Sequence, residues 1–150
     1  MKRLTALVAL PLLAWGVSLV TSAEPATTAA PAVAPAHYTA EQVERGRYLV
    51  EKVAMCGQCH SPRNDRGDLQ MEHWLQGGPV PLLTPKGYAN KWAYKAPRLA
   101  GLPQHTDEQL VTLLTTGINR DGKTPMPPMP PFRMTAEDAV AIAAYLRSLS

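Results

Sequence analysis

The sequence predicts an all-α fold, and three observations lead to that prediction. Three segments, beginning at Thr39, Thr106 and Thr135, carry helix-start signals. No run of residues alternates between apolar and polar side chains over the length of a strand. A C-x-x-C-H motif, residues 56–60, follows the first of these segments. Together they predict a small helical domain, with a long irregular region between the motif and the second helix.

The N-terminus has the pattern of a secretory signal peptide, residues 1–23. Two basic residues precede an uncharged run from Leu4 to Val20, and small residues at 21–23 suit cleavage. An uncleaved membrane anchor facing the periplasm is the alternative, because the run is at the lower length limit for spanning a bilayer. Pro11 and the small residues favour cleavage, so we expect export to the periplasm.

Residues 24–37 are predicted to be a linker, because Pro, Ala and Thr dominate and cannot bury a core. Residues 38–150 then form one domain. The only charged residues in 1–23 are Lys2 and Arg3, so the formal charge falls from +3 to +1 without them. A nearly neutral chain without runs of like charge argues against nucleic acid as a partner.

The first helix is expected to run from Thr39 to about Ala54. Gln42 completes a capping box with Thr39, and Tyr38 and Val43 are placed as a hydrophobic staple. The spacing is that of a helix N-terminus in which side chains satisfy the first backbone N–H groups.

The other two helices show related signals. Thr106 has Gln109 at the capping-box offset, and Gly117 is placed as a left-handed C-terminal cap. Thr135 has Asp138 at the same offset, and its helix is expected to continue to Leu149.

The motif Cys56-Gly57-Gln58-Cys59-His60 is the attachment signature of haem c. On one helical turn, residues three apart share a face, so Cys56 and Cys59 can each form a thioether to one haem vinyl group. His60 then points at the iron as an axial ligand. We expect one covalent haem c, with its iron.

Three other interpretations of these residues require features that the sequence lacks. A thioredoxin-like pair should follow a strand in a βαβ unit, and a zinc site needs a second pair of Cys or His at ligand spacing. The chain has two cysteines, and its other histidines are scattered. Because haem attachment occupies both cysteines, they are not expected to form a structural disulfide.

A glycine inside the first helix, Gly46, the C-x-x-C-H motif and a last helix with the sequence Ala-Ile-Ala-Ala-Tyr-Leu-Arg-Ser-Leu resemble class I cytochromes c over residues 38–150. The resemblance implies a cytochrome c fold wrapped around one haem. Because Gly46 lacks a Cβ, it allows close approach of another helix, and Tyr145 is the expected neighbour.

Residues 59–64, 96–99 and 129–135 look like segments of the monohaem modules that accompany bacterial periplasmic dehydrogenases. This finer resemblance implies that the carbonyl of Pro97 accepts a hydrogen bond from the ring N–H of His60 and so orients the ligand. The alternative is that Pro97 is an ordinary loop proline.

Met129 is the predicted sixth ligand of the iron. Met134 directly precedes the cap Thr135 and is expected to pack towards Ala139. Met126 and Met129 both lie in a proline-rich segment, residues 125–131, whose stiffness does not choose between them. The cytochromes that this sequence resembles commonly place the ligand Met-Pro about six residues before the helix cap; Met129 is six before Thr135 and Met126 is nine before it. Met126 remains the alternative.

Residues 61–105 are expected to wrap the haem as a loop, with at most a short helix at 69–76. Its aromatic residues can cover the porphyrin or simply pack in the core; they are Trp74, Tyr88, Trp92 and Tyr94. Its lysines can form a basic rim, but separately solvated lysines are the favoured interpretation; they are Lys86, Lys91 and Lys95. The remaining histidines, His37, His73 and His105, are interpreted as surface or cap residues.

These features predict an electron carrier with no catalytic residues of its own. With His60 and Met129 both on the iron, no position is open for a substrate or for oxygen. Its expected partners are redox proteins, such as a dehydrogenase, an oxidase or another cytochrome. The alternative is a haem enzyme or gas-binding sensor with an open axial position.

Overall fold

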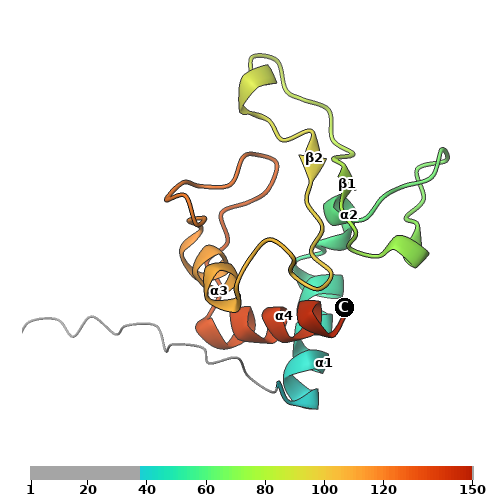
Figure 1. Cartoon of the computed structure of the whole chain (residues 1–150). Helices are drawn as coiled ribbons and strands as arrows, with labels where there is room; N and C mark the ends of the chain where they lie inside the picture. Colours follow the sequence, from blue (N-terminus) through green and yellow to red (C-terminus); the bar gives the residue numbers. More distant parts are fainter. Residues whose placement is uncertain (1–37, 150) are drawn as a thin grey trace, which may run out of the picture.

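The computed structural model describes residues 38–149 (Figure 1). The predicted signal peptide, the linker and His37 lie outside this range. The elements in chain order are α1 (Ala40–Tyr48), the π-helix η1 (Leu49–Val53), α2 (Gly57–His60), the 3-10 helix η2 (Met71–His73), β1 (Gly78–Pro79), the 3-10 helix η3 (Ala89–Lys91), β2 (Lys95–Ala96), α3 (Asp107–Thr116) and α4 (Ala136–Ser148).

Both predicted capping boxes are present. The Thr39 hydroxyl accepts a hydrogen bond from the Gln42 amide at 3.2 Å, and the Gln42 side chain accepts one from the Thr39 amide at 2.9 Å. Thr106 and Gln109 make the same pair of bonds at the start of α3. The predicted helix starts are therefore confirmed, and the first predicted helix continues through η1 to Val53.

The start of α4 differs in one detail. Thr135 accepts a hydrogen bond from the Asp138 amide at 3.2 Å. The Asp138 carboxylate does not return it and instead accepts from Nε of Arg45 on α1 at 3.0 Å. The Asp138 amide therefore makes one of the two hydrogen bonds of a capping box, and its carboxylate connects α4 to α1.

The crossing of α1 and α4 confirms the predicted contact between Gly46 and Tyr145. A Cβ at Gly46 would lie 2.8 Å from the Cβ of Tyr145 and would overlap the carbonyl group of Ala141. Any side chain at this position would therefore push the two helix backbones apart.

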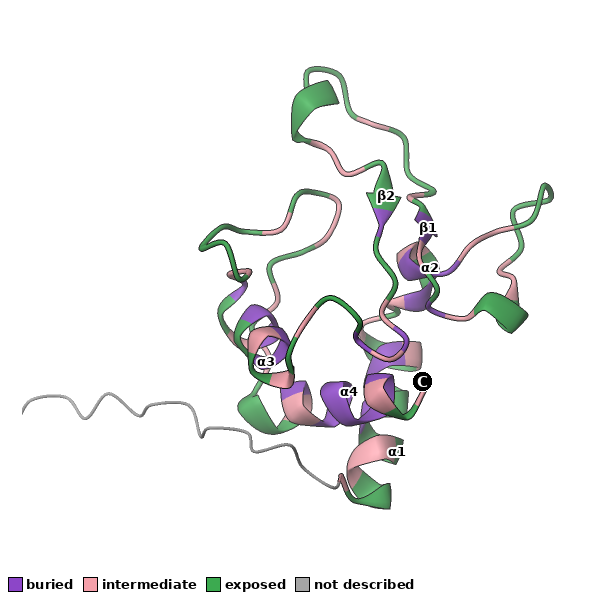
Figure 2. Cartoon of the chain, viewed as in Figure 1, coloured by how far each residue is buried: buried purple, intermediate pink, exposed green. Residues whose placement is uncertain are grey.

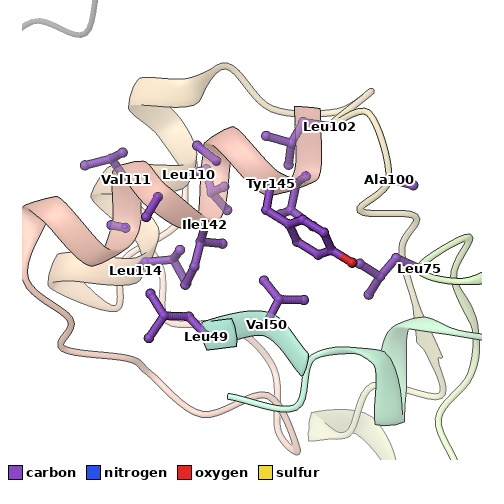
Figure 3. Close-up of a cluster of buried hydrophobic side chains, with 14 residues drawn as sticks. Leu49, Val50, Leu75, Ala100, Leu102, Leu110, Val111, Leu114, Ile142 and Tyr145 are labelled. Atoms are coloured by element: carbon purple, nitrogen blue, oxygen red, sulfur yellow. The ribbon is translucent and has the colours of Figure 1, made fainter. Parts of the chain in front are cut away.

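The core lies where α1 and η1, α3 and α4 meet, and buried residues line the inner faces of these helices (Figure 2). Figure 3 shows this cluster, to which η1 contributes Leu49 and Val50, α3 contributes Leu110, Val111 and Leu114, and α4 contributes Ile142, Tyr145 and Leu146. Leu75 and Ala100 extend it towards the irregular region. The core therefore holds the long irregular region that follows α2 at two points along its length.

The predicted helical architecture agrees with the structure, which adds one short pair of strands. β1 and β2 pair antiparallel, with Gly78 opposite Ala96 and Pro79 opposite Lys95. Strands of two residues cannot show the alternation by which a strand is recognised in a sequence. The short helix expected at 69–76 is present only as η2.

Within residues 38–149, no helix is both long and apolar enough to cross a membrane.

Candidate functional site

The two cysteines and His60 lie on one helical turn, as the motif predicts. Cys56 precedes α2, and its carbonyl accepts a hydrogen bond from the His60 amide at 2.9 Å. Met55, in the left-handed region with φ of 47°, redirects the chain from η1 into α2. Both thiols are free and partly buried. The turn therefore presents two sulfur atoms and an imidazole together.

The ring of His60 is held by the chain. Its Nδ1 lies 2.8 Å from the carbonyl oxygen of Pro97, and a carbonyl can only accept, so Nδ1 carries the hydrogen. Nε2 is then the nitrogen with a free lone pair. His60 is only 7% exposed, and burial lowers its pKa, although the bond to Pro97 opposes this. The hydrogen bond expected between His60 and Pro97 is thus present.

Trp74 supports the attachment turn from the side. A Cβ at Gly57 would overlap the Trp74 ring, so the glycine inside the motif provides the space for that ring. The Trp74 indole donates a hydrogen bond to the hydroxyl of Tyr145, which donates in turn to Glu51. The sequence alone leaves the role of Trp74 open, and in the structure it connects the turn to α4.

Ser61 is a second support of the attachment turn, one not predicted from the sequence. It is almost fully buried, and its hydroxyl accepts a hydrogen bond from the Leu75 amide at 2.8 Å. Leu75 is itself fully buried, with φ of 57°, a conformation that leucine rarely adopts. A serine after a motif histidine carries no signal that would have revealed this contact.

The three candidate methionines differ in their surroundings. Met134 packs against the core and its amide donates to the Leu114 carbonyl at 2.9 Å, so its predicted structural role is confirmed. The side chain of Met126 is 49% exposed, whereas Met129 is partly buried. None of the hydrogen bonds found in residues 38–149 joins Met129 directly to α2.

The residues fit a covalent haem. The turn offers two thiols and an imidazole nitrogen, which is the donor set for haem c. Nε1 of Trp92 is buried and has no hydrogen-bond partner among the described residues. A buried N–H without a partner is rare and suits the carboxylate side chains that haem carries. A surface pocket of about 440 Å³ also lies beside Cys59, lined by Pro81, Leu82 and others.

The environment of Cys56 does not resemble that of a reactive thiol. Burial raises its pKa to about 11. Thiols of disulfide-exchange enzymes have a lowered pKa instead. Within residues 38–149, no group of three His, Cys, Asp or Glu side chains is arranged to hold a metal ion, as a zinc site would require.

The three lysines of the irregular region lie within residues 80–95, which comprise an exposed loop and the first residue of β2 and are here called the loop. Lys86, Lys91 and Lys95 are all exposed, and no acidic residue occurs between Glu72 and Asp107. Leu83 on the same loop is 95% exposed. The loop is therefore positively charged, with apolar side chains in contact with water.

The remaining described histidines lie outside this arrangement. His73 is exposed in η2, and His105 is partly buried just before the cap Thr106. Both positions agree with the surface and cap roles expected for them.

Comparisons with known proteins agree with this geometry. Residues 41–146 match the family model described as "Cytochrome C oxidase, cbb3-type, subunit III". The chain is 29% identical over 115 residues to the fructose dehydrogenase cytochrome subunit of Gluconobacter japonicus, covering 70% of this chain and 21% of that subunit. It is 55% identical over 42 residues to a diheme cytochrome c-type protein of Cereibacter sphaeroides, covering 28% of this chain and 14% of that protein.

The chain thus corresponds to only a part of each of these relatives. The family model, in contrast, runs from α1 to α4 and includes the C-x-x-C-H turn. The chain therefore belongs to the cytochrome c family described by that model, and it is a c-type cytochrome, a class of haem protein that transfers electrons.

Proposed function

We propose that this protein is an exported electron carrier that holds one haem c through Cys56 and Cys59, with His60 and Met129 as the axial ligands of the iron. It exchanges single electrons with redox protein partners, and one role that its relatives suggest is that of the cytochrome subunit of a dehydrogenase. The proposal assigns no bond-making or bond-breaking chemistry to the chain.

The observation that carries the proposal is the hydrogen bond of 2.8 Å between Nδ1 of His60 and the carbonyl oxygen of Pro97. It selects the tautomer whose Nε2 can bind iron, and it prevents rotation of the ring. A histidine of purely structural importance would need no such orientation on the same turn as two free thiols.

The number of cysteines supports the proposal of one haem. Each covalent haem c needs two, and the sequence contains two, both in one motif. One relative is described as a diheme protein. The matched region is 14% of that protein, so its second haem need not correspond to any part of this chain.

The chain's own residues determine how the cofactor works. Haem iron, when bound, supplies a reversible one-electron change between two oxidation states. Cys56 and Cys59 would hold the group, His60 and Met129 would be the ligands of its iron, and the buried Trp92 N–H would donate to a haem carboxylate. Filling both axial positions keeps substrates off the iron, and a thioether ligand raises the potential relative to a second histidine.

The partner is expected to approach the loop that carries Lys86, Lys91 and Lys95. A positive loop beside the pocket at Cys59 favours an acidic partner, because opposite charges speed encounter and orient the two proteins. The exposed Leu83 provides apolar area for the contact itself.

The proposal is tested on full-length protein made together with haem maturation machinery. Mass spectrometry should show one haem that survives acid–acetone extraction. The reduced protein should have a c-type spectrum that carbon monoxide leaves unchanged, and the oxidised protein should show the methionine-to-iron band. An unmodified mass would sink the covalent assignment, and a spectrum that shifts with carbon monoxide would favour a sensor or enzyme with an open site.

Two controls separate attachment from folding and from export. Cys56→Ala and Cys59→Ala should each reduce covalent holoprotein sharply, whereas Met71→Ala, at an exposed methionine, should not. Fractionation of the producing cells should place the holoprotein in the periplasm. Holoprotein that stays with the membrane after a salt wash would favour the uncleaved anchor.

A further inference from the structure

Two residues that flank the β1–β2 ribbon at one end, Gly77 and Pro97, both form hydrogen bonds with the candidate iron ligand His60. The Gly77 amide, just before β1, donates to the His60 carbonyl oxygen at 2.7 Å. Pro97, just after β2, accepts from the His60 ring at 2.8 Å. The strands pair with Gly78 opposite Ala96, and Figure 1 shows them side by side next to α2. The ribbon is therefore attached to the backbone and to the side chain of the same histidine.

Gly77 makes this double attachment sterically feasible. It has φ of 80°, and a Cβ there would lie 2.8 Å from both the Ala96 carbonyl oxygen and the Arg98 amide nitrogen. A non-glycine residue would push the two strands apart at the point where they meet His60.

The other end of the ribbon is bound to the methionine loop, residues 125–131. The Val80 amide donates to the Tyr94 carbonyl at 2.9 Å and extends the pairing beyond β1 and β2. Ala93, the residue before Tyr94, donates a hydrogen bond from its amide to the Pro127 carbonyl oxygen at 2.7 Å. Pro127 lies two residues before Met129, whose own amide donates to the Met126 carbonyl at 3.3 Å.

The methionine loop needs a hydrogen-bond donor from another segment because it has few backbone amide hydrogens of its own. Five of its seven residues are proline, which has no amide hydrogen, and the Met129 amide is used inside the loop. Its carbonyl groups can only accept. Among the backbone hydrogen bonds of residues 38–149, the bond from Ala93 is the one that joins this loop to another segment.

We propose that residues 77–80 and 93–97, here called the brace, are a positioning device that holds Met129 at a fixed place relative to His60. This inference rests on the proposed His60 and Met129 ligation. The bond from Ala93 to Pro127 is the contact through which the brace acts on the methionine side, and Pro97 acts on the histidine side. Fixing both ligand segments to one ribbon keeps the thioether on the iron and excludes outside ligands.

The test uses Ala93→Pro in the haem-loaded protein, because proline removes the amide hydrogen without adding charge. Trp92, which would precede the new proline, already has φ of −127° and ψ of 131°, within the range that a residue before proline adopts. The control is Met71→Pro, at the exposed first position of η2, after Gln70 with φ of −81° and ψ of 93°.

The readout is the affinity of the oxidised protein for imidazole, which competes with the methionine for the iron. Ala93→Pro should bind imidazole about fivefold more tightly than the wild type, the effect expected from losing one backbone hydrogen bond that holds the loop. Its methionine-to-iron band should weaken, while the covalent haem mass is unchanged. Met71→Pro should match the wild type. A folded, haem-loaded Ala93→Pro that also matches the wild type overturns the inference.

A second measurement needs no variant. If the brace holds the methionine on the iron, the bound methionine must stabilise the brace by the same free energy. Saturating wild-type protein with imidazole should therefore speed hydrogen exchange of the Ala93 amide about fivefold. Unchanged exchange at Ala93 would contradict the brace even if Ala93→Pro fails to fold.

The outcomes also separate this inference from the proposed function. A wild type without a methionine-to-iron band refutes the ligand assignment, and the brace falls with it. A wild type with the band, combined with unchanged imidazole affinity in Ala93→Pro and unchanged exchange at Ala93, refutes the brace alone.

Discussion

The indole N–H of Trp74 donates a hydrogen bond of 3.2 Å to the hydroxyl of Tyr145, 71 residues further along the chain. The Trp74 ring packs on Gly57 in the attachment turn, and Tyr145 belongs to α4 at its crossing with α1. The same hydroxyl donates to Glu51 at 2.9 Å. Burial raises the pKa of Tyr145, so this donor stays protonated at neutral pH. One tyrosine thus joins the cofactor turn to the helix pair.

Tyr145→Phe should lower the free energy of unfolding of the haem-bound protein by about 1–2 kcal/mol, because it removes two hydrogen bonds and leaves the part-buried Trp74 indole N–H without a partner. Denaturant unfolding followed by haem absorbance measures this. Tyr94→Phe is the control, since its hydroxyl bonds the Ala89 carbonyl on an exposed loop, and it should change stability by less than about 0.5 kcal/mol. Equal effects of the two substitutions would contradict a special role for Tyr145.

Gly46→Val should destabilise the protein by about 3 kcal/mol, the upper end of the usual range for overpacking, because the obstacle is the Ala141 backbone rather than a movable side chain. Gly46→Ala should already lower the melting temperature. Ala136→Val, at the exposed start of α4, is the matched control and should have little effect. A wild-type melting temperature for Gly46→Val would show that the helices do not cross there.

Met129→Ala should abolish the methionine-to-iron band, open the iron to carbon monoxide and lower the potential, because the thioether stabilises the reduced state. Met126→Ala should retain the band, since Met126 is the more exposed of the two. Absorbance spectra and potentiometric titration of the two variants decide the assignment. Loss of the band only in Met126→Ala would show that Met126 is the ligand.

Charge reversal of Lys86, Lys91 and Lys95 to Glu should change the rate at which the reduced protein is oxidised, in a direction set by the charge of the oxidant. Oxidation by hexacyanoferrate, an anion, should slow, and oxidation by a cationic cobalt complex should speed up, both most clearly at low salt. Stopped-flow absorbance measures the rates.

The control for this prediction carries the same change in net charge elsewhere. Lys52, Arg66 and Lys123 are exposed and lie outside the loop. If their reversal to Glu alters both rates as much as reversal on the loop, electrons do not leave preferentially through that surface.

His105 should make stability depend on pH. Burial, and then the charge of Arg120, lower its pKa below the ordinary value of 6.5. The unfolded chain therefore takes up a proton first, and the folded state loses stability as the pH falls below 6.5 and through the lower folded pKa. His105→Gln should remove this pH-dependent contribution. The free energy of unfolding of the wild type should therefore fall relative to that of the variant as the pH is lowered from about 7.5 to about 5. His73→Gln, at an exposed histidine, should follow the wild type at both pH values.

Local chemistry allowed the sequence by itself to determine the helix starts and the cofactor turn. The capping boxes at Thr39 and Thr106 and the C-x-x-C-H spacing depend on residues at most four apart, and such patterns are visible without a fold. The crossing at Gly46 was also predictable, because a glycine inside a helix needs a reason and close packing provides one.

Only the tertiary structure decided the contacts that join distant segments. Strands of two residues have no periodicity, so the β1–β2 ribbon and its bonds to His60 and Pro127 left no trace in the sequence. The hydrogen bonds of Ser61 with Leu75 and of Trp74 with Tyr145 depend on backbone paths that local residue preferences do not specify. The sequence determined which groups can hold a haem, and the folded chain decided what holds those groups in place, because only folding brings segments far apart in sequence within hydrogen-bond distance.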